Sequence, residues 1–230
     1  MTPFQAFRFL ALFLALLLAN AFSWVPVTKA QTAEDSVPLL SLEEGKALTD
    51  WAAGQLALLE AAPSEGSDAL VGDVARLRAL YHMTVNEKDR LDEARELAMA
   101  LRTNPALSGT LSVTVEALGG ALEVVRAKHS RWPPNKLNYL ESGISVLDQL
   151  VQKNPDNVEV RYLRLMSCYY LPFFVSRGDS VAEDFRVLTD LLPRGPGTMP
   201  PALYRGAVGF VLAKGDLNEE DRGRLQEIVN

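Results

Sequence analysis

The sequence predicts an all-α protein. Apolar residues recur at intervals of three and four along most of the chain, a spacing that places them on one face of a helix, and no segment shows the sustained strict alternation of a half-buried strand. Proline, glycine and asparagine divide the chain into segments of helical length. Because 48% of the 230 residues are hydrophobic and 23% are charged, we expect a globular domain with a continuous core.

Residues 1–30 are predicted to form a signal peptide. The apolar run FLALFLALLLA follows Arg8. Two motifs with small residues suited to signal-peptide cleavage come after it, one ending at Ala21 and one at Ala30. We favour cleavage after Ala30. The run is shorter than the roughly 20 residues that cross a bilayer. An uncleaved anchor formed by residues 9–25 is the alternative, and it is the only membrane contact that we expect.

Residues 31–40 form a polar linker, and residues 41–230 form a helical domain with about nine helices. Most of the expected helices end at proline or glycine, which terminate helices. The predicted ranges are 42–61, 68–83, 87–102, 108–128, 136–153, 158–171, 180–192, 201–214 and 218–229.

Local signals mark several of these ends. Ser41 and Glu44 form a capping box at the start of the first helix. Gly119-Gly120 lies inside the fourth helix, where we expect close packing with a neighbour, a kink or a break. Arg131 to Pro134 is expected to stop the chain before the fifth helix, and Asp179 is a plausible cap of the seventh.

The segment 136–193 carries a recognisable repeat pattern. Asn-Pro recurs at 104–105 and 154–155 after amphipathic helices, and Pro193 closes a further helix pair. After the second Asn-Pro, large, large, small and aromatic residues follow at fixed spacing. They are Leu163, Met166, Ser167 and Tyr170, and the small residues Ala94 and Ala182 occupy matching positions of second helices.

This pattern resembles the tetratricopeptide repeat. The resemblance implies antiparallel helix pairs stacked as a right-handed superhelix, whose concave face holds a peptide or partner protein. It places Arg161, Arg164 and Tyr169 near that face. Between the helices, the long segment LPFFVSRGD adds Phe173 and Phe174 as candidate partner-binding residues. An apolar loop of this kind either packs under the stack or forms an exposed contact patch, and the same choice applies to Trp132, for which we favour packing.

The sequence contains no recognisable catalytic, metal or cofactor site. The net charge is -6 without a basic run, which disfavours nucleic-acid binding. His82 and His129 have no Cys or His at ligand spacing, and we expect them at helix ends or on the surface. Cys168, the one cysteine, is expected to be buried.

The leading hypothesis is a non-enzymatic protein-interaction or scaffold module, exported to the periplasm or cell envelope, without a cofactor. The alternative is a small-molecule-binding accessory component, for example of a solute transporter, with a cavity inside the helical stack. A closed pocket lined by Tyr169, Tyr170 and Phe173 would favour the alternative, and an open groove would favour the first hypothesis.

Overall fold

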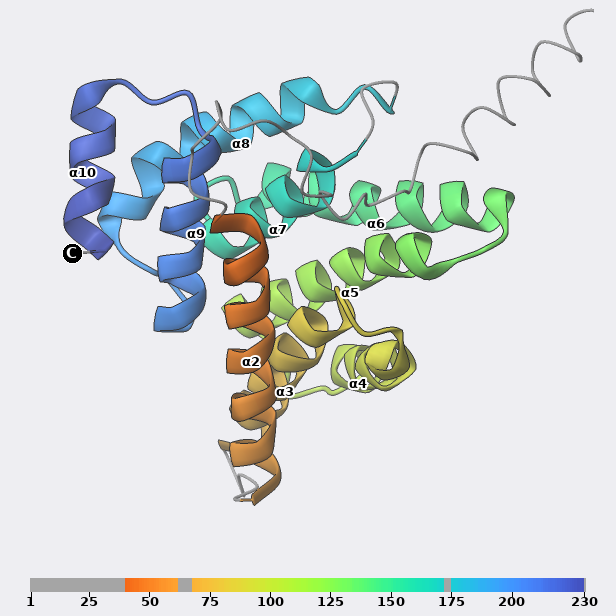
Figure 1. Cartoon of the computed structure of the whole chain (residues 1–230). Coiled ribbons are helices and arrows are strands. Elements are labelled where there is room, and N and C mark those ends of the chain that lie inside the picture. The colour runs from red at the N-terminus through yellow and green to blue at the C-terminus, as the bar shows by residue number, and fades with distance from the viewer. Residues whose placement is uncertain (1–39, 62–67, 172–174, 230) are drawn as a thin grey trace, which may run out of the picture.

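The computed structural model describes residues 40–61, 68–171 and 175–229 (Figure 1). These residues form nine α-helices and two one-turn 3-10 helices, and no β-strand occurs among them. The all-α prediction and the expected number of helices are therefore confirmed. The elements are α2 (Leu40–Ala61), α3 (Ala69–Thr84), η2 (Lys88–Arg90), α4 (Leu91–Arg102), α5 (Gly109–His129), α6 (Pro133–Lys153), α7 (Val158–Tyr169), α8 (Gly178–Leu191), η4 (Leu192–Arg194), α9 (Pro201–Lys214) and α10 (Glu219–Val229).

Helices that follow one another along the chain pack against each other, most extensively α5 against α6. Two arrangements go beyond this sequential packing. Helix α5 also packs against α3 and α7, and α2 contacts α9 as well as α3. In Figure 1, α2 stands between the helices α3 to α6 and the helices α9 and α10. The right-handed superhelix stays a prediction.

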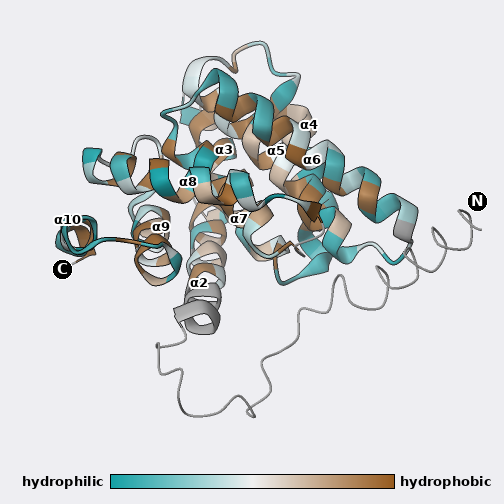
Figure 2. Cartoon of the chain, turned by 90° about the horizontal axis from the view of Figure 1, so that it is seen from above, coloured by the Kyte–Doolittle hydropathy of each residue, from teal (hydrophilic) through white to brown (hydrophobic). Residues whose placement is uncertain are grey.

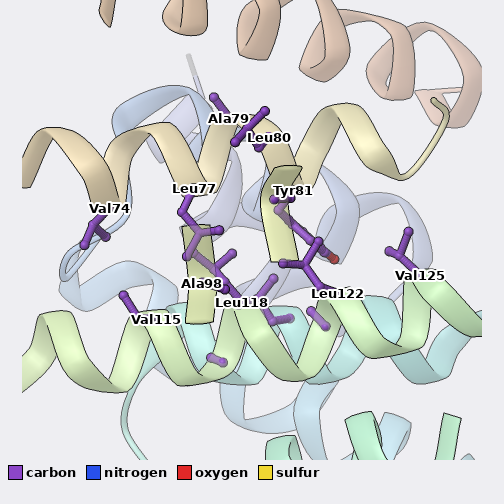
Figure 3. Packing of buried hydrophobic residues seen from close by; sticks show 14 of the residues in the cluster. Val74, Leu77, Ala79, Leu80, Tyr81, Ala98, Val115, Leu118, Leu122 and Val125 are labelled. Atoms are coloured by element: carbon purple, nitrogen blue, oxygen red, sulfur yellow. The ribbon is translucent and has the colours of Figure 1, made fainter. Parts of the chain in front are cut away.

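The larger core cluster lies between α2, α3, α4 and α5. Leu77 of α3 faces Leu118 and Leu122 of α5, and each of the three is at most 1% exposed. Figure 3 shows these side chains in the space between the two helices, whereas Leu80 lies on the other side of α3. Leu77 and Tyr81 are four residues apart on α3, as Leu118 and Leu122 are on α5, so apolar faces with helical spacing are the surfaces that pack.

A second cluster joins α7, α8, α9 and α10. Leu188 and Val208 are fully buried in it, and Phe210 packs its ring against those of Tyr169 and Phe185. Trp51 of α2 packs against both this cluster and the larger one. Figure 2 shows hydrophobic (brown) and hydrophilic (teal) residues interspersed along each helix, as expected of helices with one buried face.

Helix α5 continues without a break through Gly119-Gly120. Gly120 lies against Gly143 of α6, where a Cβ atom on Gly143 would be 2.5 Å from the Gly120 carbonyl oxygen. The glycines therefore allow the two backbones to approach closely, which was the first of the three predicted explanations. A kink or break is not needed.

Three sequence-based predictions are wrong in detail. Helix α6 begins at Pro133 instead of near residue 136, because proline fits the first turn of a helix, where its missing N–H is not needed. Asp179 lies inside α8 and does not cap it. Trp132 is 64% exposed, so it does not anchor the loop in the core.

The small residues of the repeat pattern differ in their surroundings. Ala94 is fully buried on α4, as expected at a close helix crossing. Ala182 is exposed on α8, so the same prediction is wrong there. Cys168 is buried, as predicted.

The proposed signal peptide and residues 31–39 of the linker lie outside the described residues. Helix α2 begins at Leu40, so Ser41 lies within the helix and not at its cap, and the predicted capping box is wrong in position. Across the ranges that the structure does describe, no helix has the length and apolar character required to cross a bilayer.

Candidate functional site

A partly open pocket of about 570 Å³ lies where α2, α3, α5 and α7 meet. This volume falls in the range of about 300–1,000 Å³ that is usual for small-molecule sites. Helix α5 forms one wall and α7 another, while α2 and the end of α3 complete the site. Its lining comprises Leu48, Thr49, Asp50, Tyr81, His82, Val85, Asn86, Glu87, Ala121, Val124, Val125, Lys128, Tyr162, Leu163, Met166, Ser167, Tyr170 and Leu171.

The walls of the pocket are mainly apolar. Ala121 and Val125 come from one face of α5, and Leu163 and Met166 come from α7. Three of these four residues are buried in the protein core and Met166 is half-buried, so the wall is continuous with the packed interior. An apolar molecule in the pocket would contact these packed side chains in place of water, which is favourable.

Charged and amide side chains gather at one side of the pocket. Asp50, Asn86 and Glu87 are exposed there, and Asn86 Nδ2 donates a hydrogen bond to Thr49 Oγ1 at 3.1 Å. This bond links the loop after α3 to α2. The pocket therefore has a polar rim beside its apolar walls.

Lys128 and His129 lie at the carboxyl end of α3. Lys128 Nζ donates to the Val85 carbonyl at 2.5 Å, and His129 Nε2 lies 2.9 Å from the Thr84 carbonyl oxygen. The Lys128 ammonium is favourably placed at this end of the helix, where carbonyl groups lack helical partners. Burial lowers the pKa of the Lys128 ammonium.

Tyr81, His82 and Ser167 bring three polar groups into the pocket without a hydrogen bond to any described residue. Tyr81 is 5% exposed and Ser167 9%, while the His82 ring is half-buried beside Trp51 and Tyr81. Burial, followed by the charge of Arg78, lowers the pKa of His82 to about 4. Burial also raises the pKa of Tyr81. Both side chains are therefore uncharged at neutral pH.

Arg161 and Arg164, two of the candidate partner-binding residues, lie inside the protein. Arg164 binds Asp184 through two hydrogen bonds of 2.8 Å, and Arg161 Nη1 donates to the same carboxylate at 2.9 Å. Asp184 is fully buried on α8. Two positive groups on α7 thus compensate one buried carboxylate and hold α8 against α7. Their role toward a partner stays a prediction.

The remaining candidates divide between the core and the residues that are not described. Tyr169 packs edge-on against Phe185 and Phe210, away from the pocket, whereas its neighbour Tyr170 is 41% exposed and lines the pocket. Phe173 and Phe174 lie outside the described residues. Leu171 and Val175, on either side of them, are half-buried and pack against a small cluster around Cys168.

Within the described part of the chain, no group of His, Cys, Asp and Glu side chains is arranged to hold a metal ion. Burial raises the pKa of the Cys168 thiol to about 11, so the thiolate form that acts as a nucleophile is scarce at neutral pH.

Sequence reasoning missed the pocket residues Tyr81 and His82. His82 follows the apolar run of α3 and resembles an ordinary residue near a helix end. In the sequence, the one signal is that this polar ring stands within the otherwise mostly apolar segment Leu80 to Met83. The structure shows that the other members of this segment are buried. The pocket itself depends on residues from four helices, which no local pattern brings together.

Comparison of the chain with protein-family models, curated protein sequences and solved structures gives no match. The described residues form an all-α fold with the pocket of small-molecule size described above.

Proposed function

We propose that this protein is a non-enzymatic binding protein that holds a mostly apolar small molecule in the pocket between α2, α3, α5 and α7. The observation that carries the proposal is the combination of volume and lining: about 570 Å³, apolar walls and a few polar groups. This combination is typical of ligand sites. The pocket differs from the closed one expected from the sequence, because it is partly open and, of Tyr169 and Tyr170, only Tyr170 is in its lining, while Phe173 lies outside the described residues. We favour the small-molecule alternative on the volume and the apolar lining alone.

The chemistry of the pocket supports binding without catalysis. Its one histidine is uncharged and has no carboxylate or thiol partner in a described hydrogen bond. The buried thiol of Cys168 is not part of the lining. A nucleophile paired with a base, which covalent catalysis needs, is thus not assembled from the described residues.

Calorimetric titration with 1-octanol, 1-nonanol and 1-decanol tests this proposal. Each methylene that enters an apolar site contributes about 0.8 kcal/mol, which corresponds to roughly a fourfold gain in affinity per carbon. We expect such a gain along the series. An affinity that does not depend on chain length, or no binding at all, would contradict the proposal.

A matched pair of variants locates the binding. Met166→Trp adds a bulky ring to the pocket wall, whereas Met99→Trp adds the same ring on α4, where Met99 is 54% exposed. Binding should be lost or weakened at least tenfold in the first variant and unchanged in the second. Equal binding by both variants would place the alcohol elsewhere.

A protein or peptide partner is the second candidate, favoured by the partial opening of the pocket and by the exposed ring of Trp132. Apolar side chains of a partner could enter the same opening. Competition distinguishes the two surfaces on which a partner could bind. A partner that uses the pocket is displaced by 1-decanol. A partner that uses the Trp132 surface is not displaced by 1-decanol, and its binding is weakened by Trp132→Ser.

We also propose export to the periplasm or cell envelope, based on the apolar run and cleavage sequences within residues 1–30. Mass spectrometry of the protein recovered from cells checks this. A chain that starts at Gln31 or at Phe22 agrees with a cleaved signal, whereas an intact N-terminus in the membrane fraction agrees with the anchor.

A further inference from the structure

Three polar groups from two helices that line the pocket restrict the kind of molecule that it accepts. The Tyr81 hydroxyl and the His82 imidazole come from α3, and the Ser167 hydroxyl comes from α7. Figure 3 shows the Tyr81 side chain leaving α3 toward α5. None of the three has a hydrogen-bond partner among the described residues.

These groups are not sealed inside the protein. In the described part of the chain, Arg76 Nε is the only sealed side-chain nitrogen or oxygen without a partner. The polar atoms of Tyr81, His82 and Ser167 are therefore accessible to solvent, and all three residues belong to the pocket lining. A ligand that displaces water from them loses affinity unless it makes equivalent hydrogen bonds.

All three groups are uncharged at neutral pH, and together they can both donate and accept. The tyrosine and serine hydroxyls donate, while a neutral imidazole carries one donor and one acceptor nitrogen. A hydroxyl group complements this set, because it accepts from one partner and donates to another. A carboxylate can only accept, and an ether oxygen cannot donate.

The charges around the pocket also disfavour an anion. Asp50 and Glu87 are acidic lining residues, and Lys128 is the basic residue among the described lining. The Lys128 ammonium already donates to the Val85 carbonyl at 2.5 Å. A carboxylate would lose its hydration in an apolar site whose lining has more negative than positive groups.

We infer that the ligand is an uncharged hydroxyl-bearing amphiphile, whose hydroxyl binds Tyr81, His82 and Ser167 while its hydrocarbon part lies against α5 and α7. This inference rests on the proposed function, since it specifies the ligand of the same pocket. In this orientation, the polar end of the ligand lies beside Tyr81 and His82, and its apolar end lies against residues such as Leu163.

The test compares 1-decanol, 1-methoxydecane and decanoate in calorimetric titrations of the full chain at pH 7. The alcohol and the ether share their hydrocarbon chain and differ in the hydroxyl donor. We expect 1-decanol to bind at least threefold to tenfold more tightly than the ether, the equivalent of one neutral hydrogen bond. Decanoate should bind more weakly than the alcohol.

Variants then assign the difference to residues. His82→Phe keeps an aromatic ring beside Trp51 but removes the acceptor nitrogen, so the preference for alcohol over ether should disappear. Tyr81→Phe should weaken the binding of alcohol and ether alike by about threefold to tenfold. Tyr139→Phe removes a hydroxyl from α6, outside the pocket lining, and should change neither.

Two results would overturn the inference. Equal binding of alcohol and ether by the unmodified protein would show that the hydroxyl is not recognised. Decanoate binding more tightly than decanol, with the advantage lost in Lys128→Met, would assign an anionic ligand. Either result could accompany a normal dependence on chain length, so the inference can fail while the proposed function stands. Loss of the chain-length dependence would remove both.

Discussion

Glu159 is a buried carboxylate whose two oxygens accept four side-chain hydrogen bonds. Both of its carboxylate oxygens accept from Arg78, at 2.7 and 2.9 Å, and Thr114 and Thr198 add hydrogen bonds of 3.2 and 3.3 Å. These partners come from α3, α5 and the loop before α9, while Glu159 lies in the first turn of α7. One side chain thus connects four parts of the chain.

We expect Glu159→Gln to lower the free energy of unfolding by about 3–5 kcal/mol, because it leaves the Arg78 guanidinium buried without a counter-charge. Replacing both partners in Arg78→Met/Glu159→Leu should cost less than the single change, since no buried charge remains. Urea denaturation followed by circular dichroism measures both effects.

Arg224 provides the contrasting surface case. It pairs with Asp221 and lies at 3.8 Å from Asp190, and its side chain is 42% exposed. Arg224→Met should change the free energy of unfolding little, because exposed ion pairs contribute little to stability. If Glu159→Gln costs no more than this variant, the buried network has no special role in stability.

The residue scale is also where the sequence was least informative. Arg161 and Arg164 follow the helical pattern of an exposed face, and only the structure shows Asp184 buried between them. A charged residue that pairs with another across two helices has the same sequence signature as a solvated one. Burial of such pairs depends on distant parts of the chain, so local patterns do not reveal it.

Among the elements, the crossing of α5 and α6 makes the most specific demand on the sequence. A methyl group on Gly143 would lie 2.5 Å from the Gly120 carbonyl oxygen and 3.0 Å from the Val124 amide nitrogen. Both are backbone atoms, so the contact can be relieved only by separating the helices.

Gly143→Ala should therefore destabilise the protein by about 1–3 kcal/mol, as overpacking does, although alanine favours helix more than glycine. Gly54→Ala on α2 is the matched control, because Gly54 is exposed and has nothing within 4 Å of the added carbon. It should stabilise by about 0.5–1 kcal/mol. Thermal denaturation of the two variants checks the opposite signs, and a shift in the same direction would refute the close-crossing explanation.

Helices were the best-predicted level of structure. Apolar spacing and the breakers between segments located all nine, because both act over a few neighbouring residues. The errors fall where one residue type has two uses. Proline at 133 starts a helix as readily as it ends one, and the carboxylate of Asp179 suits the first turn of a helix as well as its cap.

At the scale of the whole molecule, His82 makes the stability of the fold depend on pH. The pKa of this residue is about 4 in the folded protein and about 6.5 when exposed. Between these values the unfolded chain binds a proton that the folded chain does not. The free energy of unfolding therefore falls as the pH is lowered from 6.5 to 4, and the contribution of His82 is complete only above pH 6.5.

We expect the loss of this contribution, relative to pH above 6.5, to reach about 3 kcal/mol at pH 4. His82→Phe removes the titrating group and keeps an aromatic ring, so its stability should decline less steeply than that of the unmodified protein over this range. Carboxylates titrate equally in both, and the difference between the two curves isolates His82. Urea denaturation at pH 7.0, 5.5 and 4.5 measures it, and parallel curves would show that His82 is not buried as described.

The pocket also belongs to this scale. It is assembled from α2, α3, α5 and α7, and each contributes two or more of the lining residues. The sequence supplied the helices and their apolar faces. The position at which those faces diverge and leave a space follows from the angles between helices, which depend on the packing of the whole chain.

The contact between α2 and α9 has a consequence for how the chain folds and unfolds. Leu48 lies close to Gly206, so the first described helix touches the helix before the last. In an open array of repeats each pair contacts only its neighbours, and such arrays can lose structure from one end. Here helices far apart in the sequence support each other. We therefore expect high cooperativity, with slow formation of the native state because contacts distant in sequence must close together.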